Sequence, residues 1–137
     1  MAVQSLAKGV HVSPRKAGVV ASLVRGRTVA DALVILEHTP RRASLAVIKA
    51  IKSAAANADY NHHYKPDTLK ITEITVNAGQ RQKRFRPVAR GMAHPYQHRS
   101  SHIKVTVDGE IRQPKKPAVT AKKDVATKTE ATDKEVK

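Results

Sequence analysis

The sequence has no cysteine, no tryptophan and few aromatic residues, and each of these absences argues against a class of function. Without cysteine, its 137 residues cannot form a disulfide, a thiolate metal site or a thiol nucleophile. No apolar run approaches the roughly 20 residues of a membrane span, and the N-terminus lacks the apolar stretch of a secretory signal. We therefore expect a cytoplasmic protein. Three tyrosines and one phenylalanine argue against stacking on unpaired bases as the main mode of binding.

Negative charge is also scarce. Lys and Arg number 26 against 11 Asp and Glu, which gives a net charge of +15 and a pI near 10.5. Such a balance in a small protein indicates a polyanionic partner. Because aromatic residues are few, phosphate contact and recognition of shape fit this partner better than base stacking. The chain length allows one small domain plus extensions.

The stretch from residue 76 to residue 107 lacks acidic residues, and its middle part, residues 79–101, has few large apolar ones. Alternating apolar residues on both sides of it predict two strands. About 25 residues without apolar content are too many for an ordinary loop. We expect a long hairpin that projects roughly 40 Å at most from the body, at about 3.3 Å per residue. Gly91 suits its tip, where the backbone must be permissive. The large apolar residues between positions 79 and 101 are Phe85, Val88, Met92 and Tyr96.

Three helix starts are predicted from local signals. Ser13-Pro14 and Thr39-Pro40 each place a capping hydroxyl before a proline, which fits the first helical position because its missing N–H needs no partner there. Thr28 and Asp31 form a capping box for a second helix between these two. Apolar residues at helical spacing predict the buried face of each helix. These are Ala17, Val20, Leu23 and Val24 for the first helix, Ala32, Leu33, Ile35 and Leu36 for the second, and Val47, Ile48, Ile51, Ala54, Ala55 and Ala58 for the third.

The first helix should end at Arg25-Gly26 and the third near residue 58, before a turn region at residues 61–67. Residues 2–12 give a weak strand signal. A second strand should run from Leu69 to Val76 with a bulge between Ile71 and Ile74, and a third from Ile103 to Asp108. The predicted fold class is α+β, with three helices packed on a small three-stranded antiparallel sheet and a long protruding β-hairpin.

Two regions are expected to differ in organisation. Residues 1–112 should form one domain, with the hairpin arm at about residues 78–102. Residues 113–137 are rich in Lys, Pro and Ala and carry 7 Lys and 4 acidic residues, a net charge of +3 that leaves +12 on the first 112 residues. Because this basic tail has no apolar periodicity, we expect it to be disordered unless a partner binds it.

Two helix starts carry an unusual pair of cations. Ser13-Pro14-Arg15-Lys16 and Thr39-Pro40-Arg41-Arg42 place positive charge where the helix dipole disfavours it. Exposed N–H groups beside cations are a good cradle for phosphate. Solvated charges at a helix end would explain one such occurrence, but two in a chain of net charge +15 favour contact with a polyanion.

Catalytic and metal sites have no convincing candidate. His94, His98 and His102 are spaced by four, but Pro95 argues against a helix, and on a strand the three lie too far apart for one tetrahedral site. The acidic residues are scattered, and no glycine-rich phosphate loop follows a strand. Ser13 is better explained as a helix cap than as a nucleophile. We expect no enzyme activity, no cofactor, no metal and no small-molecule substrate.

A series of motifs resembles the bacterial large-subunit ribosomal protein twenty-two family, the universal ribosomal protein of the peptide exit tunnel. The resemblance runs from about Ala7 to Val107. Each motif is weak alone, but the order and spacing together are specific. The motifs are Ser13-Pro14-Arg15-Lys16-Ala17, Arg25-Gly26, Ala32-Leu33-x-x-Leu36, Ser53-Ala54-x-Ala56-Asn57-Ala58, Lys83-Arg84, Pro87, Ala89-x-Gly91-x-Ala93 and Ser101-His102-Ile103.

The resemblance implies a structural protein of the large subunit of the cytoplasmic ribosome. It implies a body that binds 23S-type ribosomal RNA and supports assembly, and a hairpin that lines the exit tunnel beside neighbouring ribosomal proteins and the passing nascent polypeptide. The family usually carries a basic residue where this chain has Val88 and Met92. On this view the tunnel-lining tip comprises Pro87, Val88, Ala89, Arg90, Gly91 and Met92.

The candidate RNA-binding residues are basic side chains of the helices, the arm and the adjoining strand. An alternative function is a free-standing nucleic-acid-binding protein that uses its second and third helices as a helix-turn-helix. That alternative leaves the polar arm without a role. The candidates are Arg15, Lys16, Arg25, Arg27, Arg41, Arg42, Lys49, Lys52, Arg81, Lys83, Arg84, Arg86, Arg90, Arg99, His102 and Lys104.

Overall fold

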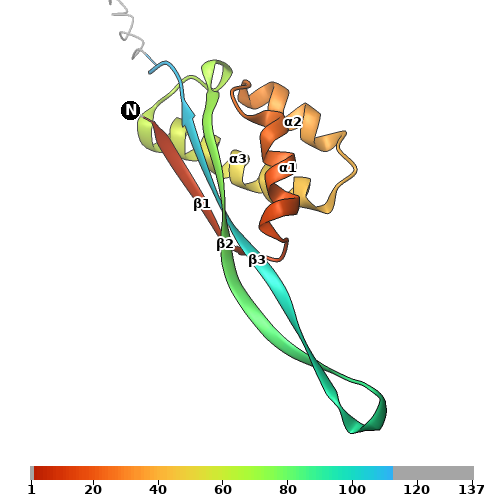
Figure 1. Cartoon of the computed structure of the whole chain (residues 1–137). Coiled ribbons are helices and arrows are strands. Elements are labelled where there is room, and N and C mark those ends of the chain that lie inside the picture. The colour runs from red at the N-terminus through yellow and green to blue at the C-terminus, as the bar shows by residue number, and fades with distance from the viewer. Residues whose placement is uncertain (1, 113–137) are drawn as a thin grey trace, which may run out of the picture.

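An antiparallel sheet of three strands in the order β1-β3-β2 runs through the molecule (Figure 1). The computed structural model describes residues 2–112. The strands are β1 (Val3–Val10), β2 (Lys70–Pro87) and β3 (Ala93–Asp108). The β2–β3 ladder begins at Lys70 opposite Asp108 and continues to Pro87 opposite Ala93. Both strands therefore extend well beyond the body, and their far halves form the arm.

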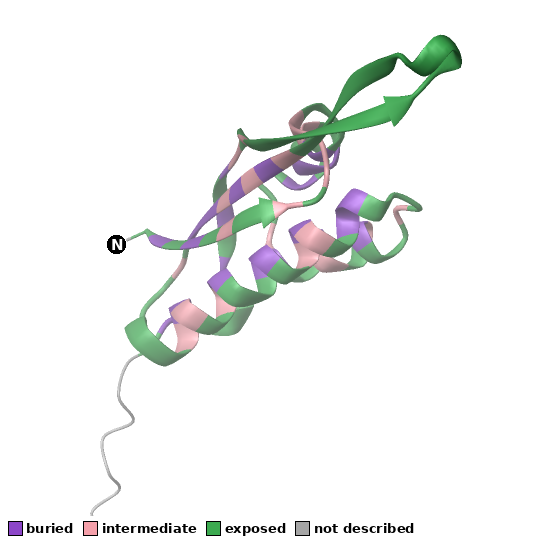
Figure 2. Cartoon of the chain, turned by 90° about the horizontal axis from the view of Figure 1, so that it is seen from below, coloured by how far each residue is buried: buried purple, intermediate pink, exposed green. Residues whose placement is uncertain are grey.

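Three helices cover one face of this sheet: α1 (Pro14–Val24), α2 (Val29–Glu37) and α3 (Arg42–His62) (Figures 1 and 2). Helix α3 packs on β1 and β3, α1 packs mainly on β2, and α2 lies against α1 and α3. Short 3-10 helices occupy Pro66–Thr68, named η1, and Ala89–Gly91, named η2, which lies at the tip of the arm. This arrangement confirms the predicted α+β fold.

The hydrophobic core lies between the helices and the body half of the sheet. Figure 2 shows buried residues in the body and an arm that is exposed along its length. No residue from 77 to 100 belongs to the core cluster. The largest fully buried apolar side chains are Leu36, Ile51, Leu69, Ile71, Ile74, Ile103, Val20, Val24, Val47, Val105 and Val107.

The predicted helix starts are confirmed in two cases and wrong in one. Pro14 occupies the first turn of α1 after Ser13, although the Ser13 side chain makes no capping hydrogen bond. The Thr28 hydroxyl accepts from the Asp31 N–H at 3.3 Å and donates to the Asp31 carboxylate at 2.7 Å. Helix α3 begins at Arg42 rather than at Pro40. The reason is that the Thr39 hydroxyl donates back to the Ile35 carbonyl at 2.7 Å and so closes α2 instead.

Other boundaries also differ from the predictions. Leu23 is 45% exposed, and Ala21 is buried in its place on the inner face of α1. Helix α3 continues to His62, one turn beyond the predicted end, and stops where His63 adopts a left-handed conformation at φ 54°. Asn61 therefore belongs to the helix and not to the turn. The first strand spans Val3–Val10, a clearer element than its sequence signal.

The bulge predicted in the second strand is present. Its register shifts between Ile71 and Glu73, so that Ile71 and Ile74 are both buried although they are three residues apart. The tip conformation also agrees with the sequence, because Gly91 has a φ of +72°. The basic tail at residues 113–137 lies outside the described residues.

Because the arm contributes nothing to the core, the body should fold without it. We expect a variant in which residues 81–99 are replaced by an Asn-Gly turn to unfold cooperatively and to keep the amide NMR dispersion of the body. A two-residue type I′ turn suits the flanking antiparallel strands. Loss of dispersion in α1 and α3 would mean that the arm is needed for folding.

Candidate nucleic-acid interface

Two adjoining clefts lie where the arm leaves the body, and we call them the arm-base clefts. They have volumes of about 560 and 550 Å³. Both are bordered by the first turn of α1, by the residues that start α3, and by the lower part of the arm. The first is lined by His11, Val12, Ser13, Lys16, Arg41, Arg42, Ala43, Gln97, His98 and Arg99. The second is lined by Ser13, Pro14, Arg15, Lys16, Val19, Arg41, Ala78, Gly79, Arg81, Arg99 and Ser100.

The clefts bring together cations that are far apart in the sequence. Lys16 comes from α1, Arg41 precedes α3, and Arg99 comes from β3, and all three border both clefts. Among the residues that the structure describes, no acidic residue lines either cleft. The two helix starts that carry paired cations therefore face one shared space at the base of the arm. Adjacent helix N-termini and unpaired cations favour the binding of phosphate groups.

A third, smaller cleft lies on the other side of the arm base, beside β1. Lys8, Gly9 and Gln82 are among its lining residues, and so are His98 and Arg99. The Gly9 N–H donates to Nδ1 of His102 at 3.0 Å. His102 thus accepts a hydrogen bond from the backbone of β1, and its role is at least partly structural. It fixes the irregular end of β1 against the central strand.

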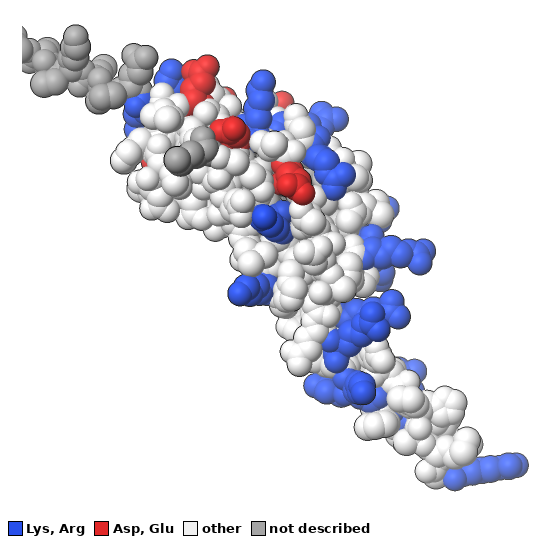
Figure 3. All heavy atoms as spheres, turned by 60° about the vertical axis from the view of Figure 1, so that its left-hand side comes forward, with Lys and Arg blue, Asp and Glu red and all other residues white. Residues whose placement is uncertain are grey.

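Charge is distributed unevenly along the molecule. Figure 3 shows Lys and Arg side chains along the body and the arm, whereas Asp and Glu gather at the end of the body remote from the arm. Within residues 2–112 the ion pairs are Lys65 with Glu110 at 3.5 Å and Arg112 with Asp59 at 3.8 Å. None of the cations that line the arm-base clefts is in an ion pair with another residue of the range 2–112, so within this range their charge is available to an outside partner.

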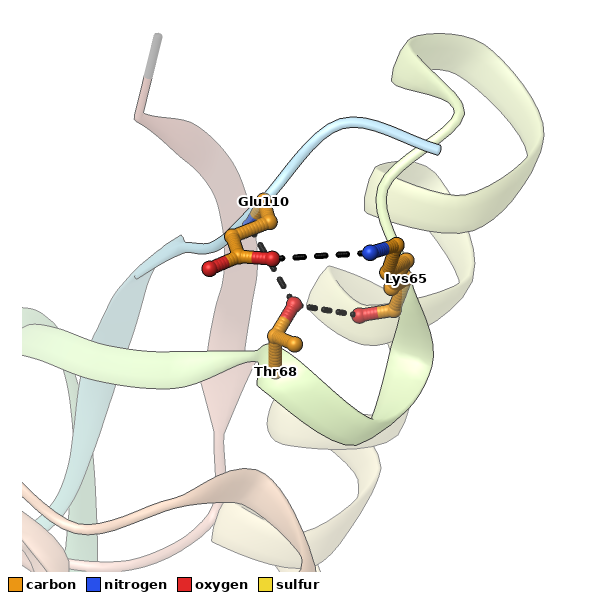
Figure 4. A network of polar contacts seen from close by, with 3 residues as sticks. All are labelled: Lys65, Thr68 and Glu110. Carbon is orange, nitrogen blue, oxygen red and sulfur yellow. Dashed lines mark hydrogen bonds and ion pairs between the residues drawn. The ribbon is translucent and has the colours of Figure 1, made fainter. Parts of the chain in front are cut away.

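The remote end uses its polar groups within the protein (Figure 4). The Thr68 hydroxyl donates to the Lys65 carbonyl at 3.0 Å and accepts from the Glu110 N–H at 3.2 Å. The Arg112 N–H donates to the carbonyl of His63 at 2.7 Å. These contacts, with the two ion pairs, fasten the segment after β3 to the end of α3 and to η1. The two ends of the molecule therefore differ in charge and in how far their polar groups are used within the protein.

The arm carries four further predicted cations, Lys83, Arg84, Arg86 and Arg90, and all four are exposed. Lys104 lies on β3 within the body, opposite Leu6 of β1, and is half-buried. Lys83 and Arg84 lie on β2, and the Arg84 guanidinium donates to the Lys83 carbonyl at 2.8 Å. Arg90 lies in η2 at the tip and has a left-handed backbone, with φ 61°. The Val88 N–H donates to the Met92 carbonyl at 2.8 Å and closes the hairpin. Val88 is 43% exposed and Met92 is 60% exposed, so the tip is partly apolar.

Some predicted cations also have structural contacts. The Arg25 guanidinium donates to the Ile74 carbonyl at 2.9 Å and joins the end of α1 to β2. Nε of Arg27 donates to the Leu23 carbonyl at 3.0 Å. Lys49 lines a groove beside β1, and Lys52 is exposed on the same helix. The structure thus brings six of the candidates together at the arm-base clefts, namely Arg15, Lys16, Arg41, Arg42, Arg81 and Arg99.

Sequence reasoning did not select several residues of these clefts. Gln97 borders the first arm-base cleft, Lys8 borders the third cleft, and His11 and His98 border both of these. His11 could have been found, because it precedes the Ser13-Pro14 helix start by two residues. The involvement of Gln97 could not, because it depends on how β3 passes the helices.

Two further features are absent from residues 2–112. No helix in this part is both long and apolar enough to cross a membrane. No group of three His, Cys, Asp or Glu side chains in it lies close enough together to hold a metal ion.

Comparisons with known proteins agree with this geometry. Residues 5–108 match the family described as ribosomal protein L22p/L17e. The large ribosomal subunit protein uL22 of Lactobacillus helveticus (strain DPC 4571) is 50% identical over 101 residues, which cover 74% of this chain and 86% of that protein. Proteins of the same name from Clostridioides difficile (strain 630) and Oceanobacillus iheyensis are 48% and 47% identical over 107 residues, which cover 78% of this chain and 96% and 95% of theirs.

Proposed function

The chain belongs to the ribosomal protein L22p/L17e family, a structural constituent of the large subunit of the cytoplasmic ribosome and not an enzyme, and from that premise we propose how it binds. The arm-base clefts and the arm form one surface that contacts 23S-type ribosomal RNA. Through this surface the protein supports subunit assembly. Its hairpin tip lines the peptide exit tunnel, beside neighbouring ribosomal proteins and the nascent polypeptide.

One observation carries this proposal: two helix N-termini and the base of the arm present unpaired cations to the same two clefts. Lys16, Arg41 and Arg99 border both clefts, where no acidic residue is found. A cleft with these properties fits the sugar–phosphate backbone of folded RNA, because phosphate contacts position a protein on nucleic acid. Residues 1–112 accordingly form the RNA-binding domain, and residues 78–102 form its arm.

The exposure of the arm supports a partner that surrounds it. From residue 81 to residue 99 every side chain is exposed. Ordering the backbone costs about 1–2 kcal/mol of conformational free energy per residue. The arm has too few apolar side chains to offset that cost by packing on one another. Contacts of the arm cations with phosphate can offset it. At the tip, residues 87–92 are the part that faces the tunnel, and Val88 and Met92 make its wall less cationic there.

The helix-turn-helix alternative agrees less well with the fold. A reading helix presents the exposed residues of its N-terminal turn to base edges in the major groove. Here Arg41 and Arg42, at the start of α3, border a cleft together with residues 97–99 of the arm. They are therefore placed for backbone contacts in a concave site that the arm helps to form.

The dependence of binding on salt tests the proposal. If about six to eight phosphates are neutralised, the logarithm of the affinity for large-subunit ribosomal RNA should fall linearly with log salt, with a slope between about −5 and −7. Filter binding from 50 to 300 mM potassium chloride measures it. An affinity that hardly changes with salt would mean that phosphate contacts do not carry the binding.

A further inference from the structure

The two faces of the arm differ in the kind of side chain that they present. Successive residues of a strand point to opposite faces, and the ladder pairs Arg84 with Tyr96, Gln82 with His98 and Arg86 with His94. One face, which we call the ring face, thus carries three planar rings from β3 beside two arginines and one glutamine from β2. The ring face comprises Gln82, Arg84, Arg86, His94, Tyr96 and His98.

The opposite face continues the side of the sheet that the helices cover. Every second residue of β3 points to this face, which includes the buried Ile103 in the body and Arg99 in the arm. Arg81 pairs with Arg99, Lys83 pairs with Gln97, and both pairs lie on this face. It therefore carries the cations Arg81, Lys83 and Arg99 next to the arm-base clefts, where they suit phosphate groups.

Two of the three rings of the ring face contact each other, and all three remain accessible. Tyr96 and His98 meet edge to face, with centroids 5.1 Å apart and planes inclined by 78°. The Arg86 guanidinium lies 5.9 Å from the Tyr96 centroid. In spite of both contacts Tyr96 is 40% exposed, and His94 and His98 are also exposed. No Asp or Glu stands between Glu73 and Asp108 in the sequence, so the arm itself carries no acidic side chain.

The spacing of the rings suits nucleobases. Alternate residues of an antiparallel strand are separated by about 6.8 Å, twice the rise of about 3.4 Å per residue. Neighbouring bases in a nucleic-acid strand are about 3.4 Å apart. The spacing of about 6.8 Å between neighbouring side chains on the ring face therefore equals two base steps. Exposed aromatic rings interleaved with arginines are the side chains on which unpaired bases stack.

From this arrangement we propose that the ring face, centred on Tyr96, binds unpaired bases of RNA by stacking, while the opposite face contacts phosphates. The inference rests on the proposed RNA-binding function and adds a second chemistry to it. Aromatic residues are too few for stacking to dominate, but the rings of this face lie together on one exposed strand. The ligand class is single-stranded RNA, in a loop or a bulge, whose bases are free to leave their own stack.

Binding of two probes by the full chain tests this proposal. The first probe is a 12-nucleotide oligoadenylate with one central 2-aminopurine, and the second is a blunt 12-base-pair RNA duplex. We expect Tyr96→Leu to weaken oligoadenylate binding roughly tenfold at every salt concentration, with an unchanged salt slope, because base–aromatic stacking contributes affinity without releasing counterions. Tyr96→Phe should keep the wild-type affinity and the quenching of 2-aminopurine fluorescence. Duplex binding should be unaffected by either change.

Phe85→Leu is the matched control, because Phe85 is 71% exposed and lies on the opposite face. It should bind both probes as the wild type does. Wild-type affinity and quenching in Tyr96→Leu would overturn the proposal that the ring face stacks on bases, but would leave the proposal of phosphate binding intact. Equal losses in Tyr96→Leu and Phe85→Leu would overturn the assignment to one face. Failure of the wild-type chain to bind either probe would contradict the proposed function itself.

Discussion

Replacing Lys16, Arg41 and Arg99 together with glutamine is expected to lower the affinity for large-subunit ribosomal RNA by roughly two to three orders of magnitude at 0.1 M salt. These residues come from three elements and border both arm-base clefts. Each lost phosphate contact should reduce the slope of log affinity against log salt by about 0.9, so the triple variant should lose nearly three units of slope. Filter binding over a range of salt gives both quantities.

A variant with the same change of charge elsewhere serves as the control. Lys65, Lys70 and Arg112 lie toward the end of the body where the acidic residues gather, and two of them are in ion pairs there. Their replacement by glutamine should change the slope by less than one unit. If the two triple variants lost affinity equally, binding would depend on net charge alone and not on the clefts.

Ile51→Ala should destabilise the body by about 2–5 kcal/mol. Ile51 lies on α3 and is fully buried in the core. Removing most of its side chain loses transfer free energy and leaves a cavity. Because small domains have a free energy of unfolding of about 5–15 kcal/mol, this loss is a large fraction of the total. Urea unfolding followed by far-ultraviolet circular dichroism measures it.

The matched control for that prediction is Leu45→Ala. Leu45 lies on the same helix but is 64% exposed. We expect this change to alter the free energy of unfolding by no more than about 0.5 kcal/mol. A loss below 1 kcal/mol in Ile51→Ala, or equal losses in both variants, would contradict the position of the core.

The fold could be predicted largely from periodicity. Strict alternation after residue 102, the slip between Ile71 and Ile74 and three apolar helical stripes identify most of the elements. The arm was predictable because a long segment without acidic or large apolar residues has no other stable arrangement in a small domain. These signals are local in the sequence. The structure agrees with them where a segment has only one favourable conformation, whatever its neighbours are.

The start of α3 was not predictable, because a threonine hydroxyl can cap the following helix or bond back to the preceding one. Thr39 does the second, and only the packing of α2 decides between them. Leu23 was misassigned for a related reason. The residue on the inner face of a short helix depends on how that helix is rotated against β2, and this rotation is a tertiary property.

The composition of the site could be predicted, but its assembly could not. The cations at both helix starts were recognisable individually, yet nothing in the sequence states that Lys16 and Arg41 face the same cleft as Arg99. His98 shows the same difficulty. Its sequence spacing raises the question of a metal site, whereas its register against β2 places it beside Tyr96 on the ring face.

Directed hydroxyl-radical cleavage within the assembled large subunit tests the central claim, that the arm and its base face ribosomal RNA, most directly. Because the chain has no cysteine, a single introduced cysteine can carry a tethered iron chelate. The account predicts strong cleavage of the RNA from Gln82→Cys on the arm and Gln97→Cys at the cleft, and weak cleavage from Asp67→Cys at the acidic end. Strong cleavage from Asp67→Cys with none from the two arm positions would contradict it.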